Sequence, residues 1–219
     1  MAGMALEIER KYLGVDFGRL RLALAKAGAQ DLGAHFESNT VYDTPGLSLC
    51  AARKLLRVRS QEWPDRTRHV LTMKLPVPAP AGATFKAREE RELEVQSAAV
   101  MGSVLLGLGF VVAARYEKVR SVWRLASGAP DGAPVLVELD ELPFANVVEL
   151  EGGAGSIDAV AARLGLDKRE ISTKSYHALH QEWRSAQGLP PERSFVFGPE
   201  ERRSLRQHLG LPDEAAACF

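Results

Sequence analysis

Cysteines and long apolar runs are scarce in this sequence. Its 219 residues include two cysteines, Cys50 and Cys218, without the spacing of a metal site. A chain of this length with so few cysteines does not depend on a disulfide framework, so we expect a reducing, cytoplasmic environment. No stretch approaches about 18 consecutive apolar residues, and the N-terminus lacks the pattern of a signal peptide. Membrane spanning and secretion are therefore not expected.

The sequence also lacks an excess of charge of either sign. It has 28 basic and 28 acidic residues, so no overall field would attract nucleic acid or an anionic membrane. There is no internal repeat, no glycine-rich phosphate loop, and no G-x-S-x-G segment around Ser172 or Ser175. What is present is a hydrophobic content of 46%, which is enough for one globular core. Any electrostatic function must therefore be local.

Alternation of residue types with a period of two predicts eight short strands. They fall at residues 5–13, 39–43, 55–60, 69–75, 88–95, 116–125, 135–142 and 147–152. Helices are expected at residues 16–28, 97–108, 156–164, 175–186 and 199–209, with loops at residues 76–83 and 127–134. Eight strands can close a barrel, so we predict an α+β fold, an eight-stranded antiparallel β-barrel with flanking helices. Residues 1–188 would form this domain, and residues 189–219 a helical extension with a partly disordered end.

Charged residues share one face of nearly every predicted strand, because side chains at i and i+2 point the same way. That face carries Glu7, Glu9, Lys11, Arg57, Arg59, Thr72, Lys74, Arg88, Glu90, Glu92, Glu94, Lys118, Arg120, Arg124, Glu138, Asp140, Glu149 and Glu151. The opposite face is apolar, as at Ile8, Val58 and Leu139. One such strand is usually the solvent side of an ordinary sheet. Dense like charge on so many strands indicates instead that this face lies inside the barrel, where cations compensate carboxylates.

An interior with separate acidic and basic clusters suits a metal-bound polyphosphate. Carboxylates bind hard divalent ions such as Mg²⁺ or Mn²⁺, while arginine and lysine hold phosphate oxygens. The histidine pair His177 and His180, spaced i and i+3, is expected on the surface rather than at a metal.

These strands carry a series of motifs in a characteristic order. The series begins with an E-x-E-x-K strand, here EIERK at Glu7, Glu9 and Lys11. It continues with YDTPGLSL, LLRVR, LTMK, EKVRSVW, VELDEL, VVELEG and STKSY. With these motifs the chain resembles, over about residues 4–187, the CYTH superfamily of triphosphate tunnel metalloenzymes. That superfamily includes class IV adenylyl cyclases, thiamine triphosphatases and inorganic triphosphatases.

The resemblance implies a tunnel that binds a metal and a triphosphate. Glu7 and Glu9 would hold one Mg²⁺ or Mn²⁺ with Glu151, while Glu149, Glu92 and Asp140 would complete the acidic wall or a second metal position. The triphosphate would be gripped by Lys11, Arg57, Arg59, Lys74, Lys118, Arg120 and Lys174, with Lys174 reaching in from a helix start. Lys11, Glu92 and Glu149 are the expected catalytic residues, since a carboxylate or second metal would activate the attacking water.

The expected activity is hydrolysis of a triphosphate with release of orthophosphate. Inorganic tripolyphosphate and thiamine triphosphate stay open as substrates, because Val41 and Leu55 stand where thiamine triphosphatases of the family tend to carry aromatic residues. The alternatives are a class IV-type adenylyl cyclase that makes cyclic AMP from ATP, and a non-catalytic module that binds polyphosphate or nucleotide. A barrel leaves no open sheet edge, so a monomer is the default, with a dimer as the other state considered.

Overall fold

The computed structural model describes residues 5–78, 84–129, 132–166 and 169–212. Within them the strands are β1 Ala5–Leu13, β2 Gln30–Asp43, β3 Leu55–Glu62, β4 Thr67–Pro76, β5 Lys86–Val95, β6 Val111–Ala126, β7 Pro134–Leu142, β8 Ala145–Glu151 and β9 Glu170–Ser172. The helices are α1 Phe17–Lys26, α2 Ser48–Ala51, α3 Ala98–Gly107, α4 Ala154–Arg163, α5 Tyr176–Ala186 and α6 Pro199–His208. No helix in these ranges is long and apolar enough to cross a membrane.

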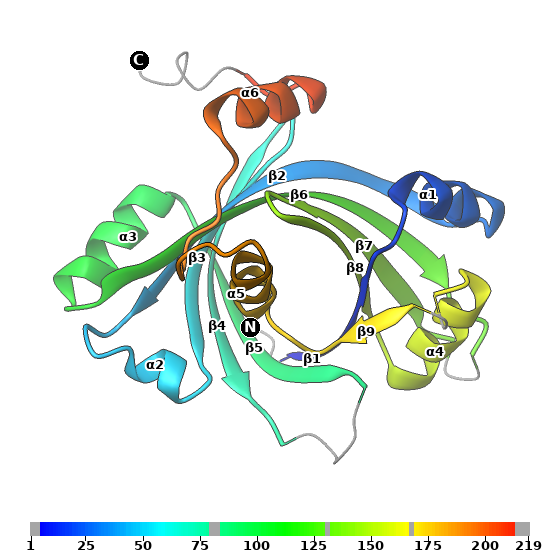
Figure 1. Ribbon diagram of the computed structural model, residues 1–219, viewed down its shortest axis with the longest axis horizontal. Coiled ribbons are helices and arrows are strands. Elements are labelled where there is room, and N and C mark those ends of the chain that lie inside the picture. The colour runs from blue at the N-terminus through cyan, green and yellow to red at the C-terminus, as the bar shows by residue number, and fades with distance from the viewer. Residues whose placement is uncertain (1–4, 79–83, 130–131, 167–168, 213–219) are drawn as a thin grey trace.

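The strands form a closed barrel, as Figure 1 shows. Their order is β5-β4-β3-β2-β6-β7-β8-β1, all neighbours are antiparallel, and β1 pairs again with β5 to close the ring. The ninth strand, β9, pairs with the end of β1 that β5 leaves uncovered. The predicted eight-stranded antiparallel barrel with flanking helices is therefore confirmed.

The predicted strands are all present, and β2 is much longer than expected. It begins at Gln30 rather than Asn39, because Gly33 at φ +90° and a shift of register between Asp31 and Ala34 interrupt the alternation that marks a strand. The short elements α2 and β9 were not predicted. Part of the expected loops, residues 79–83 and 130–131, and the C-terminal end from residue 213 lie outside the described residues.

Three predicted helix caps are formed as their sequence indicates. Asp16, Ser97 and Ser175 each accept a hydrogen bond from the backbone N–H three residues later. The fourth helix, α4, begins after Gly153 instead of at Ser156, which is buried within its first turn.

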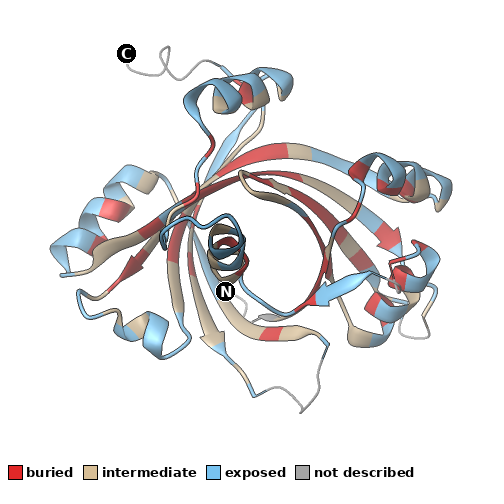
Figure 2. Cartoon of the chain, in the orientation of Figure 1, coloured by how far each residue is buried: buried red, intermediate tan, exposed pale blue. Residues whose placement is uncertain are grey.

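The hydrophobic core lies outside the barrel, between the strands and the helices. Leu24 of α1 and Ile157 of α4 are fully buried against Val137 and Leu150 of β7 and β8. On another side, α3 packs Leu105 against the outer face of the barrel. Figure 2 shows this burial where helices meet strands. Because apolar side chains face outward, the charged face of each strand is left to line the interior.

The C-terminal segment packs on the outside of the barrel. Phe195 pairs with Tyr116 of β6 in a parallel bridge, and Phe197 packs on Phe36 beneath α6. Helix α5 lies across one opening of the barrel, held by this segment through the ion pair of Arg184 with Glu192 at 2.9 Å.

Candidate active site

The barrel encloses a charged cavity of about 510 Å³, called the tunnel here. Nine basic and seven acidic side chains line it. Of the residues that the sequence placed at the site, those in the lining are Glu7, Glu9, Lys11, Arg57, Arg59, Lys74, Glu92, Lys118, Arg120, Glu149 and Glu151. The inward orientation of the charged faces is thus confirmed, while the role of each residue stays a prediction.

Lys11 lies between two carboxylates at the centre of the tunnel wall. Its ammonium is 2.5 Å from Glu9 and 2.6 Å from Glu149, and the side chain is almost fully buried. Burial lowers the pKa of Lys11, but the attraction of Glu149 and Glu9 outweighs it and raises the pKa above its ordinary value. Lys11 therefore stays charged and holds β1 and β8 together across the acidic wall.

The acidic wall carries more negative charge than its neighbours neutralise. Glu9 faces Glu151 directly between β1 and β8, and Glu138 faces Glu149 between β7 and β8. Burial, then repulsion from Glu7, raises the pKa of Glu151 to about 7. Burial also raises the pKa of Glu138 to about 8, with Asp140 and Glu149 adding to the effect against the attraction of Arg120.

This wall fits a divalent metal ion. Like charges facing each other across a strand pair are destabilising, and a hard cation with oxygen ligands removes that repulsion. Glu138, Asp140 and Glu149 each offer one carboxylate oxygen, and these atoms lie within 4.8 Å of one another. Glu138 was not among the predicted ligands, although it shares the charged face with Asp140.

The carboxylate of Asp140 is already hydrogen-bonded to two cations of the tunnel. Fully buried, it accepts hydrogen bonds from Arg120 Nε at 2.6 Å, from Lys118 at 3.0 Å and from the hydroxyl of Tyr176. These contacts fix the direction of both basic side chains. In this structure Asp140 orients Arg120 and Lys118. Its role as a metal ligand stays a prediction.

Arg57 is a buried cation with no carboxylate within 4.0 Å among the described residues. Its guanidinium donates to the hydroxyls of Tyr116 at 2.7 Å and Thr72 at 3.4 Å, and its Nε has no partner there. Its neighbour Arg59 instead donates to Asn39 and lies 3.4 Å from Glu37. Among the described residues that line the tunnel, Arg57 is therefore the basic group most available to an anionic ligand.

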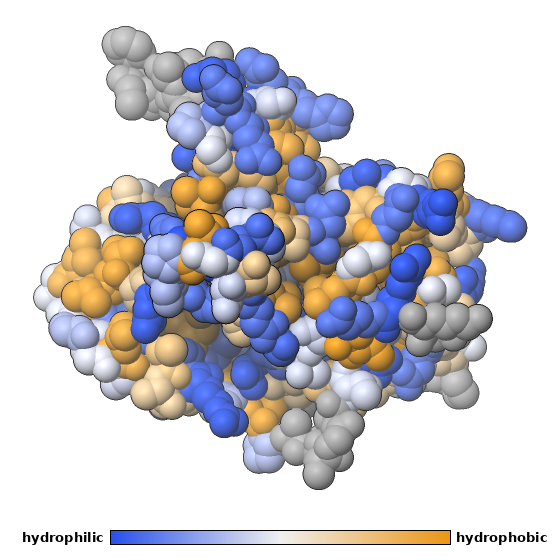
Figure 3. All heavy atoms as spheres, viewed as in Figure 1, coloured by the Kyte–Doolittle hydropathy of each residue, from blue (hydrophilic) through white to orange (hydrophobic). Residues whose placement is uncertain are grey.

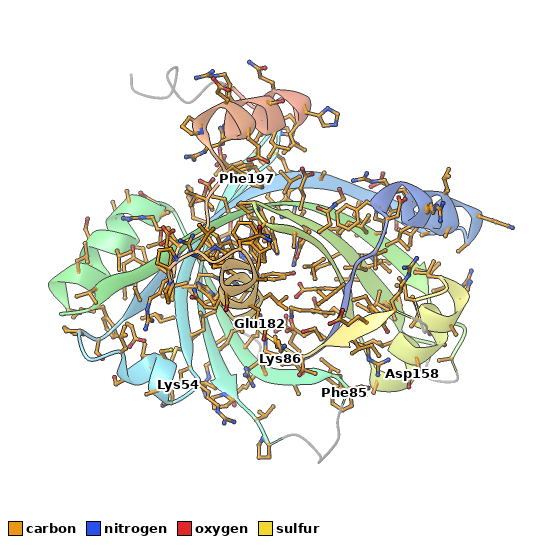
Figure 4. All side chains as sticks on the ribbon, viewed as in Figure 1. Lys54, Phe85, Lys86, Asp158, Glu182 and Phe197 are labelled. Carbon is orange, nitrogen blue, oxygen red and sulfur yellow. The ribbon has the colours of Figure 1, made fainter. Side chains whose placement is uncertain are left out.

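Lys74 and Lys86 stand at the end of the tunnel beneath α5. Lys74 is 2.7 Å from Glu7 and also contacts Glu90, and Lys86 is 2.8 Å from Glu9. Burial, then the charge of Lys11, lowers the pKa of Lys86. Figure 4 labels Lys86 on the same side of the barrel opening as Glu182 of α5.

Besides Glu138, sequence reasoning missed several residues of the site, among them Glu37, Lys86, Tyr116 and Tyr176. Glu37 is completely buried, and attraction to Arg59 and Lys118 outweighs burial to hold its pKa well below the ordinary value. The alternation of His35, Glu37 and Asn39 could have shown it, had β2 been extended toward the N-terminus. Lys86 could also have been found, because it lies two residues before Arg88 and so on the same face of β5. Tyr116 is buried in the tunnel wall and could also have been found, because it lies on the same face of the predicted strand as Lys118 and Arg120. Tyr176, half-buried in the wall, has no comparable signal.

The structure does not bring Lys174 to the tunnel. Its ammonium is 2.6 Å from Glu182, and both side chains are about half exposed, at 52% and 54%. Tyr176, two residues later, enters the tunnel instead: its ring lies 5.3 Å from the ammonium of Lys11 and 5.5 Å from that of Lys118. The start of α5 therefore contributes an aromatic ring where the sequence suggested an ammonium.

The expectation that His177 and His180 form a surface pair is wrong. His180 is 3% exposed and packs on Phe144 and Phe195, while His177 stands edge-on to Tyr116. Burial lowers the pKa of His177 to about 4, so its ring is neutral at physiological pH. The two rings attach α5 to the C-terminal segment.

Comparison with known proteins agrees with this geometry. The CYTH domain family matches residues 5–176. A protein from Pyrococcus horikoshii has 20% identity and a TM-score of 0.66, over 80% of this chain and 98% of its own. A candidate adenylate cyclase from Vibrio parahaemolyticus has 18% identity and a TM-score of 0.64, over 81% and 99%.

A third solved structure is a candidate adenylyl cyclase from Hippeastrum, described as having a dominant triphosphatase activity. It has 20% identity and a TM-score of 0.58, over 87% of this chain and 100% of its own. At these identities the three structures share the fold with this chain. No curated protein matches the chain significantly.

Proposed function

The chain belongs to the CYTH domain family, and from this premise we propose that it is a metal-dependent triphosphate hydrolase. It would take a triphosphate and Mg²⁺ or Mn²⁺ into the tunnel and release orthophosphate. Inorganic tripolyphosphate and thiamine triphosphate are the substrates left open by the sequence.

The observation that carries the proposal is the charge balance of the tunnel. Nine basic side chains line it against seven acidic ones, and Asp140 and Glu37 are buried directly behind the lining. A triphosphate brings about four negative charges near neutral pH, which this balanced set cannot neutralise alone. Divalent ions that enter with the substrate would supply the missing positive charge, and the facing acid pairs Glu9–Glu151 and Glu138–Glu149 would receive them.

The acidic residues of the tunnel suit the metal ion, and the basic residues suit the triphosphate. Glu7, Glu9 and Glu151 would hold the metal, with Glu149 and Asp140 completing the acidic wall. Bound metal supplies Lewis-acid polarisation of phosphoryl oxygens. The phosphates would be held by Arg57, Arg59, Lys74, Lys118 and Arg120, with Lys11 between the acidic and basic sides.

The hydrolytic step needs a base for the attacking water. Water would form a bond to the terminal phosphorus, its proton would pass to a carboxylate, and the bond from that phosphorus to the bridging oxygen would break. Attraction to Lys11 and Arg120 outweighs burial and holds the pKa of Glu149 well below the ordinary value, which makes it a weak base. Among the described residues, Glu92 accepts a single side-chain hydrogen bond, from the hydroxyl of Thr72 at 3.0 Å, and has no cation within 4.0 Å, so we take it as the better of the two predicted bases.

One assay tests the proposal. Purified protein is incubated with Mg²⁺ or Mn²⁺ and tripolyphosphate, thiamine triphosphate or ATP, and the product is identified. Orthophosphate supports the proposal, cyclic AMP with pyrophosphate indicates a cyclase, and tight binding without product indicates a binding module. The Glu7→Ala/Glu9→Ala variant should lose metal-dependent turnover, whereas Glu141→Ala, on the outer face of β7, should keep it.

A further inference from the structure

A second chamber of about 730 Å³ adjoins the tunnel beneath α5. Five residues line both cavities, among them Leu55, Lys74 and Lys86, so the chamber continues the tunnel at this end. Figure 3 shows a hollow beside α5, and Figure 4 labels Lys54 and Lys86 on this side of the barrel. A tripolyphosphate held by the tunnel would leave this chamber without a ligand.

The chamber is built for an organic group rather than for another phosphate. Val41, Leu55 and Ala114 contribute apolar surface, and Pro191 of the C-terminal segment lines it as well. The volume falls within the usual range of small-molecule sites, about 300–1,000 Å³, which is ample for a ring system with an attached sugar. An apolar surface stabilises such a group by removing it from water.

Four cations line the chamber without an acidic partner within 4.0 Å in the part of the chain that the structure describes. They are Arg53, Lys54 and Arg193, which are exposed, and Arg88, which is half-buried. The two acidic residues of the lining are already engaged. Asp43 accepts backbone N–H groups of Leu49 and Cys50 at 2.9 Å, and Glu192 pairs with Arg184. The chamber therefore carries a net positive charge.

We propose that this chamber selects the group attached to the triphosphate, and that it takes a nucleoside and rejects the thiazolium cation of thiamine. The inference rests on the proposed function, disfavours thiamine triphosphate among its substrates, and adds a nucleoside triphosphate to them. Ring nitrogens and carbonyl oxygens of a nucleobase accept hydrogen bonds from arginine and lysine, and the guanidinium plane stacks on the base. A positively charged ring in the chamber would be repelled by these four cations, most strongly at low salt because three of them are exposed.

The test compares substrates in wild type and in a charge-reversed variant. With Mg²⁺ at saturation, kcat/KM is measured for ATP, thiamine triphosphate and tripolyphosphate. We expect wild type to prefer ATP over thiamine triphosphate by at least about tenfold, and Lys54→Glu/Arg193→Glu to lower that ratio by at least about tenfold. The neutral variant Lys54→Gln/Arg193→Gln should give an intermediate ratio, and keeps the test valid if the reversed variant does not fold.

The matched control is Lys26→Glu/Arg203→Glu, which makes the same change of charge on the exposed faces of α1 and α6. It should leave the ratio at its wild-type value. A preference of wild type for thiamine triphosphate, or equal ratios in the chamber variants and the control, would overturn the inference. The proposed function fails separately, if wild type turns over none of the three substrates with metal present.

Discussion

Glu9 lies directly opposite Glu151 between β1 and β8, on the face that lines the tunnel. Lys11 and Lys86 contact Glu9 at 2.5 Å and 2.8 Å, but no basic group of the described chain lies within 4.0 Å of Glu151. The pair is therefore only half compensated. A divalent ion between the two carboxylates would complete the compensation.

Replacing Glu151 by glutamine should weaken metal binding while stabilising the metal-free protein. We expect Glu151→Gln to lower Mn²⁺ affinity at least about tenfold, because ligand charge sets the affinity for hard cations. It should also raise the melting temperature in EDTA, because the repulsion with Glu9 is removed. Titration calorimetry and thermal melts measure the two effects. Glu141→Gln is the control, and unchanged Mn²⁺ affinity in Glu151→Gln would contradict the assignment.

The stability of the metal-free protein should fall as the pH rises from 5.5 to 8.5, roughly the range over which the acidic wall titrates. The pKa of Glu151 is raised from 4.5 to about 7, so the folded chain binds this proton more tightly than the unfolded chain. The resulting stability is complete below pH 4.5 and is lost as the pH rises through about 7. Glu138 contributes in the same direction, up to about pH 8. Thermal melts in EDTA should show the decline, and it should be smaller in Glu151→Gln and in saturating Mg²⁺; a flat wild-type profile would refute it.

Arg57 should matter far more for activity than for stability. It has no carboxylate partner among the described residues, so Arg57→Met leaves no buried acid uncompensated. We expect kcat/KM for tripolyphosphate to fall by about 10²–10³-fold, as when one transition-state donor is removed, and the unfolding free energy to change by less than about 1 kcal/mol. Arg91→Met, on the outer face of β5, is the control. A loss of stability as large as the loss of activity would show that Arg57 is structural.

Tyr176 and Lys174 should differ in their effect. Tyr176→Phe removes the hydroxyl that donates a hydrogen bond to Asp140, and Asp140 in turn orients Arg120 and Lys118. The looser orientation of these two side chains should lower kcat/KM by about tenfold. Lys174→Ala removes only a half-exposed contact with Glu182 and should change kcat/KM by less than about twofold. Steady-state kinetics with tripolyphosphate measures both. A severe defect in Lys174→Ala would instead show that its ammonium enters the tunnel when substrate binds.

The C-terminal segment should be part of the cooperative fold. Phe195 is 4% exposed and packs on Tyr116 and both histidines of α5, so Phe195→Ala should cost about 3–4 kcal/mol of unfolding free energy. Its neighbour Val196 is 48% exposed, and Val196→Ala should cost less than about 1 kcal/mol. Urea unfolding of the two variants compares them directly. Equal effects would mean that this segment does not unfold together with the barrel.

The sequence by itself determined the barrel and the orientation of its charged face. Side chains alternate along a strand, so the parity of Glu7, Glu9 and Lys11, or of Arg57 and Arg59, decides which residues share a surface. That information is local, and it holds wherever a strand can be recognised. It failed at Glu37 because the predicted strand began at Asn39, whereas β2 begins at Gln30.

Only the tertiary structure decided which charges meet across strands. Register pairs Glu9 with Glu151 and Glu138 with Glu149, and no residue pattern within one strand contains that information. The packing of α5 then placed Tyr176 in the tunnel, left Lys174 outside it, and buried His177 and His180. Those outcomes depend on contacts between segments far apart in the chain, whereas the charged faces depend only on the two-residue period of each strand.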